Sequence, residues 1–187
     1  PYFVGGVDWM SLPITIEDVD TIEVVRGTNS AAFGSNAFLG VVNIITKSAA
    51  QGKGFRAEAT QGQKGIQDRL ARFGFADDRM AVRFTYGLRK DDGFDNVNDT
   101  HRTEIFNGRF DWTLTSNTSL SVWGGGSDGK RRDGYDFLPN QPTPVPNTFN
   151  PPHDFTTGTG FAQIKLRHNI AADNEVTVHY YHNRESA

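Results

Sequence analysis

The 187-residue chain contains no cysteine. This absence excludes a disulfide framework and any site that uses a thiolate as metal ligand or nucleophile. The chain also lacks a run of roughly 18 apolar residues, which excludes a transmembrane helix. A membrane-spanning sheet stays open, because its strands alternate between apolar and polar residues and give no strong hydropathy peak.

The chain also has no large excess of positive or negative residues. The 19 Lys and Arg residues nearly balance the 22 Asp and Glu residues, and the net charge is -3. Such a mild charge favours neither nucleic acid nor an anionic membrane surface as a partner. Glycine and phenylalanine are abundant instead, with 20 and 14 residues. Both suit alternating strands joined by tight turns.

Long segments with two-residue alternation fill the chain beyond residue 47. Between residues 80 and 89, apolar side chains occupy the even positions and polar or small ones the odd positions. Successive side chains of a strand point to opposite faces, so one face of each strand is apolar. Arg83, Arg109 and Arg167 fall on the polar face, as a water-filled or plugged lumen would allow. The pattern predicts seven strands, at residues 53–61, 68–76, 79–91, 102–115, 118–129, 157–171 and 174–187.

Several of these predicted strands are longer than the five or six residues common in soluble proteins. They match the nine to eleven residues needed to cross a bilayer obliquely. Their connections alternate between tight (77–79, 116–118, 171–174) and longer (61–67, 91–101, 130–156). Outer-membrane barrels have this arrangement, with short turns on one rim and long loops on the other. Glycines 124–126 are expected to bend or bulge the strand that leads into the longest loop.

The most specific pattern is IEVVRGTNSAAFGSNAFLGVVNIITK at residues 22–47. Two apolar runs, 22–25 and 41–45, bracket small residues punctuated by Gly27, Gly34 and Gly40. A glycine-rich connection in a soluble α/β domain is the plain alternative. However, these glycines are too widely spaced for G-x-G-x-x-G, and no Gly-Lys-Ser/Thr follows them.

The order of residues 22–47 resembles the end of the plug domain of TonB-dependent outer-membrane receptors. Those proteins carry a pattern close to I-E-V-x-R-G-P-x-S-x-x-x-G-x-x-A-x-x-G-V-I-N-I-I-T-K. Thr28 replaces the usual Pro, and Gly5 stands where the family usually has Asp. The resemblance implies an all-β chain with two parts: residues 1–50 as the C-terminal part of a plug domain, and residues 51–187 as the first strands of an antiparallel transmembrane β-barrel.

A complete barrel of this family has about 22 strands around a plugged lumen. About seven would be present here, so the chain is expected to be an internal fragment that lacks the first part of the plug and the motif that engages TonB. The implied function is active nutrient import across a Gram-negative outer membrane, in contact with the lipid bilayer and driven by TonB and its inner-membrane energising complex. A ferric siderophore is the expected cargo, while cobalamin, haem, an oligosaccharide, and a passive porin or adhesin barrel stay open.

Two groups of site residues are expected. By resemblance, Glu23 and Arg26 hold the plug to the barrel wall, although strand spacing puts them on opposite faces and a solvated charge is the alternative. The long loop combines aromatic and cationic side chains, which suit a flat anionic chelate. An unstructured surface loop is the alternative there. The expected ligand-binding residues are Tyr135, Phe137, Phe149, Phe155, Arg131 and Arg132.

Metal and catalytic sites are not expected. Asp91, Asp92, Asp95 and Asp99 crowd the loop 91–101 and could hold calcium, but their spacing lacks the EF-hand pattern and favours a solvated acidic loop. The five histidines show no metal-ligand spacing. The chain shows no paired carboxylates with a plausible cleft and no cysteine nucleophile, so we expect neither an enzyme nor a cofactor.

Overall fold

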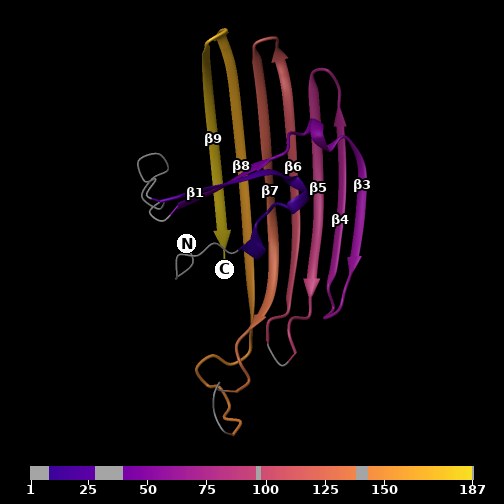
Figure 1. The fold of residues 1–187 in the computed structure, drawn as a ribbon, viewed down its shortest axis with the longest axis vertical. Helices are drawn as coiled ribbons and strands as arrows, with labels where there is room; N and C mark the ends of the chain where they lie inside the picture. The colour runs from indigo at the N-terminus through magenta and orange to yellow at the C-terminus, as the bar shows by residue number, and fades with distance from the viewer. Residues whose placement is uncertain (1–8, 28–39, 96–97, 138–142, 187) are drawn as a thin grey trace.

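The computed structural model describes residues 9–27, 40–95, 98–137 and 143–186. Within these ranges the chain forms two antiparallel sheets and three short 3-10 helices (Figure 1). No helix in the described part is long and apolar enough to cross a membrane. The predicted all-β, antiparallel fold is confirmed.

The smaller sheet forms from the N-terminal part of the chain. Two 3-10 helices, η1 (Trp9–Ser11) and η2 (Ile16–Asp18), precede the strands β1 (Val19–Arg26) and β2 (Gly40–Thr46). β1 and β2 pair antiparallel along the two apolar runs seen in the sequence. At Gly40, an added Cβ atom would lie 2.7 Å from the carbonyl oxygen of Val25, so only glycine fits this close approach. Gly5, Thr28 and Gly34 lie outside the described residues.

The larger sheet has seven strands in sequence order, each paired antiparallel with the next. After η3 (Ala50–Gly52), the strands are β3 (Gly54–Gln61), β4 (Gln67–Ala76), β5 (Met80–Asp91), β6 (His101–Thr115), β7 (Thr118–Asp133), β8 (His153–Ala171) and β9 (Asn174–Ser186). The short turns meet at one end of the sheet and the longer connections at the other (Figure 1). We call these ends the turn rim and the loop rim. The predicted alternation of connection lengths is confirmed.

Two details of the predicted strands are wrong. β7 and β8 extend beyond the predicted ends and pair with each other up to Asp133 and His153, so the long loop covers residues 134–152 instead of 130–156. Glycines 124–126 make no bulge, since β7 pairs with both neighbours there without a register shift. A Cβ atom added to Gly125 would instead lie 2.6 Å from Cβ of Asn107, so close contact with β6 accounts for this glycine.

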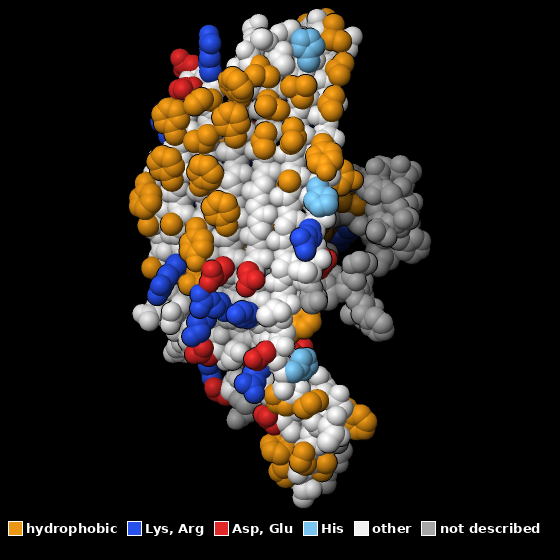
Figure 2. Space-filling view, turned by 180° about the vertical axis from the view of Figure 1, so that it is seen from behind, with side chains coloured by type: hydrophobic (Ala, Val, Ile, Leu, Met, Phe, Trp, Pro, Cys, Tyr) orange, Lys and Arg blue, Asp and Glu red, His pale blue; other side chains and the backbone are white. Residues whose placement is uncertain are grey.

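The larger sheet buries its polar face and exposes its apolar face, which is the reverse of the arrangement in a soluble protein. The smaller sheet lies across one face (Figure 1), which we call the inner face, and polar side chains such as Arg83, Thr85 and Asn107 are fully buried there. Large apolar side chains, among them Phe84 and Phe106, stay exposed on the outer face, where they form a wide band (Figure 2). This distribution suits a sheet whose outer face meets lipid.

Candidate functional site

A buried carboxylate joins the N-terminal segment to the larger sheet. η2 places Asp18, which is completely buried, against the inner face. Its Oδ1 accepts hydrogen bonds from Arg72 Nη2 and Thr85 Oγ1, both at 3.0 Å, and lies 3.6 Å from Arg83 Nε. Its Oδ2 accepts a hydrogen bond of 2.8 Å from Asn107 Nδ2. The Asp18 side chain therefore connects the N-terminal segment to three strands of the larger sheet, β4, β5 and β6.

Local structure fixes the orientation of this carboxylate. Thr15, three residues earlier, donates to Asp18 Oδ2 from its backbone N–H (3.3 Å) and from its hydroxyl (3.0 Å). Burial by itself raises the pKa of Asp18, but the hydrogen bond from Asn107 and the charges of Arg83 and Arg72 outweigh burial and hold this pKa below its ordinary value. Asp18 is therefore ionised at neutral pH.

A second set of contacts holds the segment that follows β2. Arg83 Nη1 donates to the carbonyl of Lys47 at 3.0 Å, and Arg109 Nη1 donates to the same oxygen at 3.2 Å. Asp111 pairs with Arg109 Nε at 3.0 Å and accepts a 2.8 Å hydrogen bond from the backbone N–H of Ala49. Two of the three arginines that the sequence placed on the polar face, Arg83 and Arg109, thus bind backbone carbonyls of the N-terminal segment, whereas the exposed Arg167 pairs with Glu175 on β9.

Hydroxyl groups make the third set of contacts. The carbonyl of Ser11 in η1 accepts hydrogen bonds from Ser127 Oγ (2.5 Å) and Thr159 Oγ1 (2.8 Å). The hydroxyls of Ser11 and Thr157 lie 2.8 Å apart. Together with the contacts of Asp18 and Lys47, these bonds fix the N-terminal segment to every strand from β4 to β8.

The sequence did not single out Asp18. Two features of the sequence could have indicated this residue. One is the Thr-x-x-Asp spacing at residues 15–18, which is typical of a capped turn, and the other is the pair of arginines at inward positions of β4 and β5. Glu23 and Arg26, which the resemblance did single out, lie exposed on β1. Glu23 accepts a 2.9 Å hydrogen bond from Asn43 within the smaller sheet. Contact of Glu23 and Arg26 with a barrel wall stays a prediction.

The buried carboxylate also predicts a pH dependence. Because the folded pKa of Asp18 is depressed, its stabilising effect is complete above the ordinary value of 3.8 and is lost as the pH falls through the lower folded pKa. We expect hydrogen exchange of the amides in residues 15–18 to be unchanged from neutral pH to about pH 4 and to accelerate below it. Asp18→Asn removes this acid step, whereas the exposed Asp20→Asn keeps it. An acid step of equal size in the Asp18→Asn protein contradicts the assignment.

At the loop rim, the structure separates the residues expected to bind ligand. Arg131 and Phe155 lie on β7 and β8 instead of in the loop, directly opposite each other, with the Arg131 guanidinium carbon 4.8 Å from the centroid of the Phe155 ring. Strand alternation places both on the inner face, together with the buried Ser127 and Thr157. Arg132 also belongs to β7, but as the next residue it faces outward.

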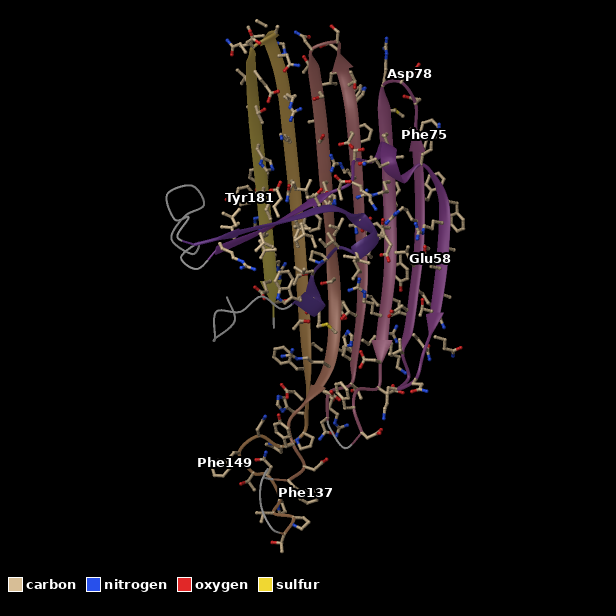
Figure 3. All side chains as sticks on the ribbon, in the orientation of Figure 1. Glu58, Phe75, Asp78, Phe137, Phe149 and Tyr181 are labelled. Atoms are coloured by element: carbon tan, nitrogen blue, oxygen red, sulfur yellow. The ribbon has the colours of Figure 1, made fainter. Side chains whose placement is uncertain are left out.

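The remaining candidates, Tyr135, Phe137 and Phe149, do lie in the loop 134–152 and are exposed. Phe137 and Phe149 lie beyond the strand ends (Figure 3). Asn147 orders the loop, because its backbone N–H donates to the carbonyl of Asp136 (3.0 Å) and its Oδ1 accepts from the N–H groups of Phe149 and Asn150. The loop thus presents aromatic rings to solvent from a hydrogen-bonded frame.

A cavity of about 470 Å³ opens among the ends of β5 to β8 at the loop rim. Three of the predicted residues, Arg131, Arg132 and Phe155, line it. Asp91 and His101 line it too, and the Asp91 carboxylate oxygen lies 2.6 Å from His101 Nδ1. A guanidinium stacked on an aromatic ring next to open space can bind an anionic group that carries a flat surface.

The acidic loop between β5 and β6 does not gather its carboxylates. Each aspartate has a partner of its own: Asp91 with His101, Asp92 with Lys90, Asp95 with Lys64, and Asp99 with the N–H of Phe94. Within the described ranges, no three His, Cys, Asp or Glu side chains are arranged to hold a metal ion.

Comparisons with known proteins give relatives for part of the chain. No protein-family model matches it. The chain is 35% identical over 104 residues to a protein named vitamin B12 transporter BtuB from Vibrio cholerae serotype O1, and 36% identical over 50 residues to the protein of the same name from Vibrio vulnificus strain CMCP6. The first match covers 52% of this chain and 17% of the relative, so the chain spans less than a fifth of the length of the curated relatives it matches.

Proposed function

Because the chain belongs to the TonB-dependent outer-membrane receptor family, we propose that the complete protein imports a scarce nutrient across the outer membrane of a Gram-negative bacterium. The observation that carries this proposal is the buried contact of Asp18 with a sheet whose outer face is apolar. In this proposal residues 1–50 are the C-terminal part of the plug and residues 51–187 are the first strands of the barrel. The relatives are transporters and not enzymes.

The proposed mechanism is mechanical. A ligand is captured at the loop rim, and TonB, energised by its inner-membrane complex, pulls on the plug so that the ligand passes inward. No covalent bond is made or broken. The contacts of Asp18, Lys47 and Ser11 with the wall resist this pull, and Glu23 and Arg26 are proposed to add further wall contacts. A buried pair such as Asp18–Arg72 suits a releasable contact, since water that enters on opening solvates both charges.

Cobalamin is the first ligand to test, because the relatives are named for vitamin B12. The Arg131–Phe155 pair supports this choice, since cobalamin combines a large flat ring with an anionic phosphodiester. A ferric siderophore, the cargo expected from the sequence, finds no support in the names of the relatives. It remains the second ligand to test, because many siderophores are also anionic and partly flat. Tyr135, Phe137 and Phe149 are proposed to make first contact with either ligand.

The test uses the complete receptor. We expect cyanocobalamin to bind the purified receptor and to accumulate in cells only when TonB is present. Arg131→Gln and Phe155→Ala should each weaken binding about tenfold, the size expected for a partly desolvated cation–π pair. The control is Arg79→Gln at the turn rim, far from the cavity, which should bind normally. Uptake of both ligands without TonB contradicts the transport mechanism, and normal binding by Arg131→Gln contradicts the assigned site.

A further inference from the structure

Four side chains form an unbroken row across the inner face at the loop rim. Asp91 on β5, His101 on β6, Arg131 on β7 and Phe155 on β8 each lie directly opposite the next in the register of the sheet. All four line the cavity of about 470 Å³. The ligand site proposed above uses only Arg131 and Phe155, and it gives Asp91 and His101 no role.

Asp91 holds the imidazole of His101 in one orientation. The Oδ2 atom of Asp91 lies 2.6 Å from His101 Nδ1, and its Oδ1 accepts a 3.0 Å hydrogen bond from the backbone N–H of Gly93. The His101 side chain is only 12% exposed, so the ring is confined. An ionised carboxylate can only accept hydrogen bonds, so Nδ1 carries the proton. In the neutral ring, Nε2 is therefore a hydrogen-bond acceptor.

Arg131 has fewer contacts that hold it in place. Its guanidinium stacks on Phe155, but among the described residues its side chain makes no hydrogen bond and no salt bridge. Its Nε atom is enclosed without a partner, whereas its Nη atoms are not enclosed and can reach the cavity. A long arginine side chain loses conformational freedom when a ligand fixes it. Ligand binding therefore benefits from a neighbour that holds Arg131 in advance.

The neighbour with a matching group is His101. Its Nε2 is also enclosed, and in the described part of the chain it has no hydrogen-bond partner. Directly opposed residues of a sheet have Cβ atoms roughly 5 Å apart on one face, and His101 lies opposite Arg131. His101 Nε2 accepts and Arg131 Nε–H donates, so each is the partner that the other lacks. The two nitrogens form no hydrogen bond with each other in this structure, but a void of about 10 Å³ beside both side chains gives them room to turn.

We propose that His101 is a positioning residue of the ligand site, and that it accepts a hydrogen bond from Arg131 Nε–H when the cavity binds its ligand. Hydrogen bonds of a functional site often shorten only in the complex. The support then runs from Gly93 through Asp91 and His101 to Arg131, whose Nη atoms hold an anionic group of the ligand. This inference rests on the proposed function, because it takes Arg131 to bind ligand. It adds that the position of the His101 proton, fixed by Asp91, sets the affinity of the site.

The experiment measures cyanocobalamin binding to the complete receptor at about pH 8, where histidine side chains are largely neutral. In Asp91→Asn the new amide oxygen takes the place of Oδ1 beside the Gly93 N–H, so the new NH₂ group faces His101 Nδ1. The ring proton then moves to Nε2, which becomes a second donor that faces Arg131. We expect binding to weaken about tenfold, as for the loss of one hydrogen bond to a charged group. On charge alone, Asp91→Asn would instead strengthen the binding of an anion.

The matched control is Asp92→Asn, which removes the same charge at the next position, where Asp92 pairs with Lys90. It should not weaken binding. His101→Gln should keep the affinity within about threefold, because its amide can both donate to Asp91 and accept from Arg131. His101→Leu can do neither and should lose about tenfold. The double variant Asp91→Asn/Arg131→Gln should bind no more weakly than Arg131→Gln alone, because the two residues act through one contact.

A spectroscopic measurement tests the inference without ligand. NMR of isotope-labelled ring nitrogens separates protonated from unprotonated atoms, and the His101 signals are those missing from His101→Gln. We expect the proton on Nδ1 in the unaltered receptor and on Nε2 in Asp91→Asn; a proton on Nε2 in both overturns the positioning role. Normal binding by Arg131→Gln overturns the ligand site itself, and this inference with it. Loss of binding by Arg131→Gln together with normal binding by His101→Leu overturns the positioning role alone.

Discussion

Asp18→Asn in the complete receptor is expected to weaken the attachment of the plug to the wall by about 3–5 kcal/mol, the usual cost of removing one partner from a buried ion pair. Asp18 is fully buried and is the carboxylate that Arg72 and Arg83 both contact. Without it, two guanidinium groups remain in a site that excludes water. Hydrogen exchange of residues 15–18 should accelerate, and the thermal midpoint of the receptor should fall.

Two further variants separate this effect from a general loss of stability. Asp20→Asn removes the same charge two residues later, at an exposed position of β1, and should change the free energy by no more than about 0.5 kcal/mol. Arg72→Met in the Asp18→Asn background removes the cation whose only acidic partner is Asp18 and should recover part of the loss. Equal losses for Asp18→Asn and Asp20→Asn rule out the buried pair as the attachment.

The second large effect is expected for Gly74→Ala. A Cβ atom at Gly74 on β4 would lie 2.1 Å from the carbonyl oxygen and 2.7 Å from the carbonyl carbon of Gly52. Both are backbone atoms, so η3 has to move away from β4. We expect a loss of about 1–3 kcal/mol from overpacking, together with faster exchange in residues 47–53, because Lys47 and Ala49 are held by the same inner face.

Gly108→Ala is the control for this prediction. Its added Cβ would meet ring atoms of Phe84 at 2.9 and 3.0 Å, which is also too close. Phe84, however, is an exposed side chain on the outer face and can turn aside. The Gly108→Ala receptor should therefore keep normal exchange in residues 47–53. If both variants accelerate exchange there equally, packing of η3 on β4 is not what holds this segment.

The sequence alone determined the strands and their faces. Five of the seven predicted strands agree with the structure within one residue at each end, and the buried positions of β5 and β6 all lie on the face predicted to be polar or small. This agreement has a local cause. Successive side chains of a strand point to opposite faces, so the alternation can be recognised from consecutive residues of the sequence. The alternation of turns and loops follows as well, because each antiparallel connection joins neighbours in the sequence.

Only the tertiary structure decided which residues meet across the molecule. Asp18 contacts Arg72 and Asn107, which are 54 and 89 positions away, and no local pattern specifies such partners. Pairing between β7 and β8 continues beyond the glycines, and this extension brings Arg131 onto Phe155 while it turns Arg132 to the outer face. Strand ends depend on hydrogen bonds to a neighbouring strand, so the cavity at the loop rim could be recognised only once the sheet was assembled.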